Sequence, residues 1–243
     1  MRLSKSGLQI YIQCPYRYYL QYVQRKRGPA SEAMLKGIDF HDRADKFFDD
    51  VSLKELANQT SIFGIESYIR SLFPEGLLFD HYAHMETVHY MGLNKKEEFI
   101  PVEREVKLVA EDILGKSAPD WCLDVGIIDR IDQVNGETIL MEYKSGKFRQ
   151  GINQELMMYK DLVELTTDYK IDKLCAIYPK ELYGTKLPSG VYFKSPSHEK
   201  QARAKVQFVK DMIRKKQWRQ KKYSLCAWCD VAEECFNDEL VIS

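Results

Sequence analysis

Hydrophobic residues recur every three or four positions over the first part of the chain, which is the spacing of one face of an α-helix. Four segments show this spacing: residues 5–22, 31–50, 52–72 and 78–93. Gly28 and Pro29 follow the first of them, and Pro74 and Gly76 separate the last two. Because glycine and proline interrupt helices, the pattern predicts that the first 95 residues are mostly helical, with breaks at these positions.

The pattern changes near residue 99, where hydrophobic and polar positions alternate as in a β-strand. Three strands are predicted there: residues 99–110, 120–134 and 138–143. Asn135 and Gly136 separate the last two and are a strong signal for a tight hairpin turn. Further elements follow: a helix at residues 151–166, strands at 172–179 and 190–194, and a long helix at 196–221. This order predicts an α/β core with a helical subdomain ahead of it.

Composition limits the class of protein. The 243 residues are 44% hydrophobic and 30% charged, which is typical of a folded globular chain rather than a disordered one. No run of about 18 apolar residues spans a bilayer, and the first twenty residues lack the apolar core of a signal peptide. We therefore expect a cytoplasmic protein without membrane partners.

The charges are unevenly distributed. The chain has 36 Lys+Arg and 36 Asp+Glu, and this balance argues against a polycation that coats nucleic acid. Residues 198–222 nevertheless hold ten basic residues against only Glu199 and Asp211. This segment is either an ordinary solvated helix face or a surface that follows phosphates.

Six cysteines fall into two groups. Cys122 and Cys175 lie in apolar stretches and are expected to be buried in strands. The other four are Cys14, Cys226, Cys229 and Cys235, of which the last three form a C-x2-C-x5-C pattern. In a reducing compartment, four thiolates suit an iron–sulfur cluster or a structural zinc ion, although a chance C-x2-C with a free thiol is the alternative. A metal here joins residues 1–24 to residues 222–243.

The predicted hairpin carries the residues best suited to catalysis. Glu142 and Lys144 are two apart on one strand, so their side chains share a face, and the turn brings Asp129 alongside them. Asp129, Glu142 and the carbonyl of Tyr143 offer the hard oxygen ligands that Mg²⁺ or Mn²⁺ prefers. Lys144 can orient a metal-activated water for attack on a phosphodiester. The alternative is an ordinary surface ion pair, since this pattern also occurs by chance.

Histidine offers a further ligand. His41 on the second predicted helix is our candidate. His81, His84 and His89 form a rival group, but no HExxH-type pattern accompanies them, so we expect them to be surface or packing residues.

Six motifs in a fixed order resemble the RecB-like branch of the PD-(D/E)XK nucleases. The motifs are LSKSGLQIYIQCPYRYYLQYV, KGIDFH, GIIDRID, MEYKSGK, ELMMY and CAWCDVAEEC, and they run from Leu3 to Cys235. The chain looks most like the small iron–sulfur members, which include the CRISPR-associated RecB-like exonucleases and the nuclease domain of AddB-type helicase–nucleases.

This resemblance implies a PD-(D/E)XK core, which is a mixed central sheet flanked by helices. It implies one nuclease domain over residues 1–243, divided as follows: a helical subdomain at 31–97, a catalytic core at 98–195, and an iron–sulfur region from 1–24 and 222–243. It implies Mg²⁺ or Mn²⁺ on His41, Asp129, Glu142 and Tyr143, with Lys144 and Tyr159 completing the catalytic residues. It also implies a [4Fe-4S] cluster on Cys14, Cys226, Cys229 and Cys235.

The activity that follows is metal-dependent cleavage of DNA, often single-stranded and often from an end, with possible partner proteins in repair or CRISPR adaptation. Two alternatives stay open: a non-catalytic, iron–sulfur- or zinc-stapled nucleic-acid-binding or assembly subunit, and a structure-specific endonuclease. Tyr143, Tyr159 and the tyrosines of residues 5–22 either stack on bases or pack in the core, and we expect core packing.

The chain departs from the family pattern at two points. Glu155 stands where the family has glutamine, while Gln154 is one residue early, so a carboxylate replaces an amide beside the site. The segment after Cys229 lacks the proline often found there.

Overall fold

The computed structural model describes residues 2–147, 151–182, 191–193, 197–222 and 224–237. Its N-terminal half contains the following elements: α1 (Lys5–Gln13), α2 (Pro15–Tyr18), the π-helical turn η1 (Tyr19–Val23), α3 (Glu32–Asp50), α4 (Leu53–Asn58), α5 (Ile62–Ser71), α6 (Leu77–Gly92) and the 3₁₀ turn η2 (Lys96–Phe99). The remaining elements are β1 (Glu103–Val109), α7 (Ala110–Leu114), β2 (Val125–Val134), β3 (Glu137–Tyr143), α8 (Ile152–Thr166), β4 (Lys173–Ile177), α9 (Pro179–Leu182), β5 (Val191–Phe193), α10 (Ser197–Arg214), the 3₁₀ turn η3 (Ser224–Trp228) and α11 (Ala232–Asn237).

Capping residues explain where the predicted helices divide. The helices expected at 31–50 and 78–93 are present as α3 and α6. The segment 5–22 is instead broken at Cys14, which ends α1 and caps α2, because Pro15 has no N–H with which to continue α1. The segment 52–72 is likewise two helices, and the Ser61 hydroxyl accepts the Gly64 N–H at the start of α5. The last long helix ends at Arg214 rather than at residue 221.

Within the described residues, five strands form one mixed sheet in the order β1-β2-β3-β4-β5. The β1–β2, β2–β3 and β4–β5 pairs are antiparallel, whereas β3 and β4 are parallel and α8 makes the crossover between them. The hairpin predicted at Asn135-Gly136 is present, with φ values of 52° and 78° that suit a primed turn. Residues 190 and 194 of the last predicted strand lie outside the described part of the chain.

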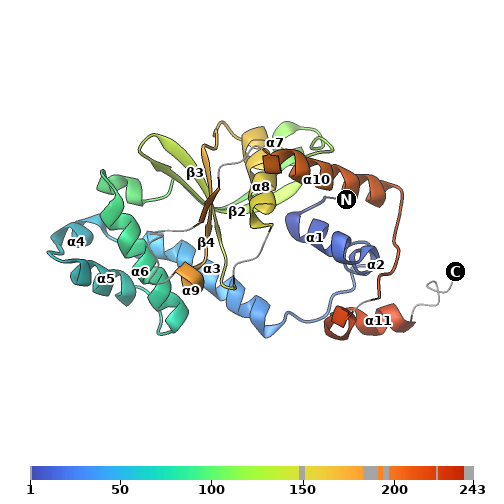
Figure 1. The fold of residues 1–243 in the computed structure, drawn as a ribbon, viewed down its shortest axis with the longest axis horizontal. Helices are drawn as coiled ribbons and strands as arrows, with labels where there is room; N and C mark the ends of the chain where they lie inside the picture. Colours follow the sequence, from blue (N-terminus) through green and yellow to red (C-terminus); the bar gives the residue numbers. More distant parts are fainter. Residues whose placement is uncertain (1, 148–150, 183–190, 194–196, 223, 238–243) are drawn as a thin grey trace.

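Helices cover both faces of this sheet (Figure 1). On one face the ring of Tyr143 packs against Phe40 of α3 and Tyr82 of α6. On the other face α8 approaches β2 at Gly126, where a Cβ atom would lie 2.9 Å from Leu162 and 3.0 Å from Tyr159. A larger residue would require the Leu162 and Tyr159 side chains to shift, so glycine suits this close approach of α8 to the sheet. The mixed sheet flanked by helices matches the α/β architecture expected from the sequence.

A buried ionic network lies between the sheet and α6. Arg130 is 1% exposed, and its guanidinium donates to both carboxylate oxygens of Asp132 at 2.6 and 2.7 Å. It also donates to Glu86 at 2.8 Å and to the Tyr143 hydroxyl at 3.4 Å. Buried charges are tolerated only when they are paired, so this network favours a single alignment of β2 against α6.

The three rival histidines do not form a metal site in the described part of the chain. His84 lies 3.2 Å from Glu66, and His89 is buried beside Phe99. The contacts of His84 and His89 agree with the surface or packing role expected of them.

Several cations of α10 pair with acids of the core. Arg203 pairs with Asp161, Lys210 with Asp124 and Arg214 with Asp120. These pairs dock α10 on the core, so part of its basic character is structural. No helix of the described residues combines the length and apolarity needed to cross a membrane.

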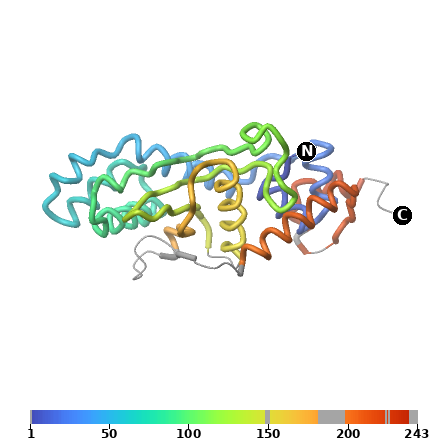
Figure 2. The backbone as a smooth tube through the Cα atoms, turned by 90° about the horizontal axis from the view of Figure 1, so that it is seen from above, coloured from blue at the N-terminus to red at the C-terminus, as the bar shows by residue number. Residues whose placement is uncertain are grey.

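The first helices, α1 and α2, and the last helix, α11, lie at the same end of an elongated molecule, opposite α4 and α5 (Figure 2). A small hydrophobic cluster joins them and consists of Cys14, Tyr16, Leu20 and Val231.

Candidate active site and cysteine site

The candidate catalytic carboxylates lie where β2 and β3 separate. The last residue pair between these strands is Arg130 with Met141, so Asp129 and Glu142 stand directly beyond it. In place of a ladder bond, the Tyr143 N–H donates to Asp129 Oδ2 at 2.7 Å. Both carboxylates are buried, at 6% and 3% exposed. The divergence of two strands therefore creates a buried acidic position at the end of the sheet.

A strained residue on β1 faces this position. The β1–β2 ladder pairs Arg104 with Arg130 and Val106 with Ile128, but it omits the pair between Glu105 and Asp129. Glu105 has a φ of 45°, a left-handed conformation that costs a non-glycine residue about 1–3 kcal/mol. Its buried Oε1 has no hydrogen-bond partner in the described part of the chain. The strained backbone and the oxygen without a hydrogen-bond partner together indicate that Glu105 has a functional role.

His41 of α3 completes a candidate cation site. Its Nδ1 lies 3.4 Å from Asp129 Oδ1 and 3.6 Å from Glu105 Oε1. Among the described residues, these three form the group whose ligand atoms all lie within 4.8 Å of one another. An imidazole and two carboxylates are a suitable ligand set for a divalent cation.

The electrostatics of this group fit a bound cation. Burial and the neighbouring charge of Glu142 raise the pKa of Asp129 to about 6. Burial alone would lower the pKa of His41, but the neighbouring carboxylates of Asp129 and Glu105 raise it to about 10. The group therefore holds a positive charge among its carboxylates, and a metal ion would replace that proton.

Two lysines hold Glu142. Lys5 at the start of α1 and Lys144 beyond β3 each place Nζ 2.6 Å from Glu142 Oε1. Burial would raise the pKa of Glu142, but the two ammonium groups outweigh it and lower that pKa. Glu142 Oε2 is buried and has no hydrogen-bond partner among the described residues, so one oxygen of an ionised carboxylate is left to bind a ligand.

Glu155 and Tyr159 of α8 lie beside the lysines. Glu155 Oε2 is 3.8 Å from Lys5 and 3.6 Å from Lys144, and its other oxygen accepts from Gln9. The Lys5 ammonium lies 4.9 Å above the centre of the Tyr159 ring. The carboxylate at this position is thus balanced by two ammonium groups.

The sequence prediction and the structure differ in detail. The structure brings His41, Asp129, Glu142, Lys144 and Tyr159 together around the end of β3. The Tyr143 side chain points away from these residues into the core, where its hydroxyl accepts a hydrogen bond from the Tyr82 hydroxyl at 3.1 Å. This agrees with the core packing expected of the tyrosines. Glu105 and Lys5 also lie in this group, although neither is expected there from the sequence. The Glu103-x-Glu105 repeat on a predicted strand was a weak signal for the first, and no sequence pattern marks the second.

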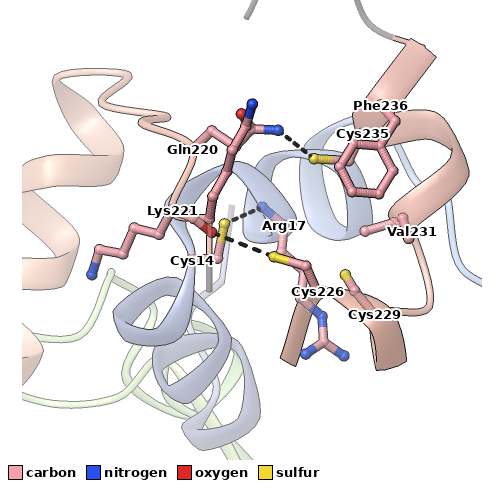
Figure 3. A pocket seen from close by; sticks show the side chains of 11 residues that line it. Cys14, Arg17, Gln220, Lys221, Cys226, Cys229, Val231, Cys235 and Phe236 are labelled. Carbon is pink, nitrogen blue, oxygen red and sulfur yellow. Dashed lines mark hydrogen bonds between the residues drawn. The ribbon is translucent and has the colours of Figure 1, made fainter. Parts of the chain in front are cut away.

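The four cysteines singled out in the sequence line one cavity (Figure 3). Cys14 comes from the α1–α2 junction, Cys226 from η3, Cys229 from the loop after it, and Cys235 from α11. The Arg17 N–H lies 3.5 Å from the Cys14 sulfur, and the Gln220 amide donates to the Cys235 sulfur at 2.8 Å.

Within the described residues, no three of these sulfurs lie within 4.8 Å of one another. Cys122 and Cys175 are buried elsewhere, as expected, although only Cys175 lies within a strand.

A family model described as the PD-(D/E)XK nuclease superfamily matches residues 2–236. No curated protein matches the chain. The match covers every element that builds the two sites above.

Proposed function

Because the chain belongs to the PD-(D/E)XK nuclease superfamily, we propose that it is a metal-dependent DNA nuclease that acts on single-stranded DNA or DNA ends. One observation carries the proposal. A candidate cation site formed by His41, Glu105 and Asp129 lies next to a glutamate–lysine pair at the point where the strands separate.

The residues present fit a divalent cation. Glu105 and Glu142 each have a buried carboxylate oxygen without a hydrogen-bond partner in the described part of the chain. We assign the ion to His41, Asp129 and Glu142, with Glu105 and the Tyr143 carbonyl as further ligands. When bound, Mg²⁺ or Mn²⁺ polarises a phosphodiester oxygen and lowers the pKa of its water.

The protein's own groups supply orientation and charge. Lys144 donates a hydrogen bond to Glu142, which holds its ammonium group at the site. We assign this ammonium group to orienting the attacking water and stabilising negative charge at phosphorus. Lys5 keeps Glu142 ionised and is itself placed by the Tyr159 ring. Glu155 offsets the charge of both lysines, so the site is close to neutral before substrate arrives.

The test is a nuclease assay on labelled single-stranded DNA. We expect Mn²⁺-dependent shortening of an end-labelled linear strand, no reaction in EDTA, and no loss of a circular strand of the same sequence. Degradation of the circle would instead indicate endonuclease action. DNA binding without Mn²⁺-dependent cleavage of either substrate would refute the catalytic assignment and favour a non-catalytic binding subunit.

For the cysteine site we propose a [4Fe-4S] cluster on Cys14, Cys226, Cys229 and Cys235. In a tetrahedral zinc site with Zn–S bonds of about 2.3 Å, the sulfurs lie about 3.8 Å apart. No three of the described sulfurs lie within 4.8 Å of one another, and the sequence resemblance implies a cluster rather than zinc. When bound, the cluster links the two ends of the chain, and we assign it a structural role.

Replacement of Cys235 by serine is expected to remove the brown colour and most of the iron of the anaerobically purified protein. The reason is that the cluster loses one of its four thiolates. Cys122→Ala is the matched control and should keep its iron, because Cys122 is buried away from the cavity. A colourless parent protein that contains zinc and no iron by elemental analysis would contradict the cluster.

We infer that the protein works in the cytoplasm, where thiols stay reduced. The sequence resemblance favours a role in DNA repair, recombination or CRISPR spacer acquisition.

A further inference from the structure

A cavity of about 730 Å³ lies beside the candidate active site. We call it the linker groove, because residues 24–31, which connect η1 to α3, contribute Arg27, Gly28, Pro29 and Ala30 to its wall. The strands β1 and β2 also line it, through Lys107, Val125, Gly126 and Ile127. Figure 1 shows the linker carrying the chain from α2 across to α3.

The linker groove opens onto the proposed catalytic residues. Lys5 and Tyr159 line it, and the Lys5 ammonium donates a hydrogen bond to Glu142 Oε1 at 2.6 Å. Ile127 lies two positions before Asp129 on β2, and Lys107 lies two positions after Glu105 on β1. The linker groove therefore lies next to the cation site, with Lys5 and Tyr159 between the two.

Positive charge predominates along the linker groove. Four cations line it, Lys5, Arg17, Arg27 and Lys107, against the carboxylate of Asp230. Lys5 and Arg17 are already paired with acids. Arg27 and Lys107 are exposed and take part in no ion pair within the described residues, so both can bind phosphates.

An aromatic column ends at Arg27. The rings of Tyr18 and Tyr22 stack with centroids 4.8 Å apart, and the Arg27 guanidinium lies 4.8 Å above Tyr22. The outer face of a stacked guanidinium is a platform for a nucleobase. Charge and stacking thus occur together on the same side of the linker groove.

We propose that the linker groove binds the single-stranded DNA that the active site cleaves, with Arg27 and Lys107 on its phosphates and Arg27 also beneath a base. The proposal rests on the nuclease function proposed above. A cavity of this volume matches the size of a ligand pocket, so it accepts a few nucleotides of one strand but not a duplex. Bases that stack on a guanidinium must also be unpaired and exposed, which a duplex does not offer.

The experiment compares the parent with the double variant Arg27→Glu/Lys107→Glu. Binding of a fluorescein-labelled oligothymidylate is followed by anisotropy in EDTA, so that no cleavage occurs. Loss of two phosphate contacts is expected to weaken binding by about tenfold or more and to reduce the magnitude of the salt slope by about 1.4. The matched control is Lys95→Glu, an exposed charge outside the linker groove, which should leave both quantities unchanged.

Two further measurements separate this proposal from the nuclease proposal. Mn²⁺-dependent hydrolysis of bis(p-nitrophenyl) phosphate by the parent tests the nuclease centre alone, because this substrate is too small to need the linker groove. Unlabelled single strand should displace the probe better than the corresponding duplex.

Unchanged oligonucleotide binding in the double variant, or equal competition by the duplex, would overturn the linker-groove assignment and leave the nuclease proposal standing. Absence of any Mn²⁺-dependent hydrolysis by the parent would overturn the nuclease proposal instead, while a binding loss in the double variant would still support the linker groove.

Discussion

Replacement of Glu142 by glutamine is expected to reduce the rate of Mn²⁺-dependent DNA cleavage by about a thousandfold. Glu142 is buried, is held ionised by Lys5 and Lys144, and leaves one oxygen without a hydrogen-bond partner in the described part of the chain. The amide has the same shape but no charge, so it neither holds the cation nor fixes the two ammonium groups. Lys144→Met is expected to lose activity to a similar extent, because the group that orients the water is removed.

The measurement is the single-turnover rate on end-labelled single-stranded DNA at saturating Mn²⁺. Glu137→Gln is the matched control, because Glu137 lies on the same strand and pairs with Lys173 near the surface, away from the site. Glu137→Gln should cleave at the parent rate. Cleavage at the parent rate by folded Glu142→Gln, with unchanged circular dichroism, would show that the assignment of the active site is wrong.

Replacement of Arg130 by methionine is expected to lower the free energy of unfolding by about 3–5 kcal/mol. Arg130 and Asp132 are each at most 1% exposed. The substitution removes the cation of this network and leaves the buried carboxylates of Asp132 and Glu86 without their arginine partner. A buried carboxylate without a counter-charge is costly, whereas a methionine fills most of the volume that the arginine occupied. The loss therefore comes from charge rather than from packing.

Urea unfolding of the parent and variants measures this effect. Arg214→Met is the comparison, since Arg214 is exposed and pairs with Asp120 at the surface. That pair is expected to contribute at most about 1 kcal/mol. A loss for Arg130→Met no larger than that for Arg214→Met would mean that the buried network does not stabilise the fold.

Local patterns were sufficient for the elements that carry the proposed site. The alternation along β2 and β3 and the Asn135-Gly136 turn place Asp129 opposite Glu142, and the two-residue spacing puts Lys144 beside it. These relations are set by strand geometry and by a turn of two residues, both of which are visible in the sequence. The same holds for α3, whose amphipathic pattern and Ser31 cap are both local.

Other parts of the site depend on contacts that no local pattern contains. Lys5 reaches Glu142 across 137 positions of sequence, and only the tertiary fold brings them together. Glu105 faces His41 because its backbone adopts a left-handed conformation that strand periodicity does not predict. The break at Cys14 is a further example, since a run of aromatic residues at helical spacing conceals the effect of Pro15.

The cysteine site has a consequence for the order of events during synthesis. The chain leaves the ribosome from its N-terminus at about 5–20 residues per second, so Cys14 and all the proposed catalytic residues emerge before Cys226. Asp230, which pairs with Arg17 and lines the linker groove, emerges later still. A nascent or prematurely terminated chain thus carries the complete set of proposed catalytic side chains without the cysteines that join its ends. Insertion of the proposed [4Fe-4S] cluster is therefore expected only after Cys235 has emerged.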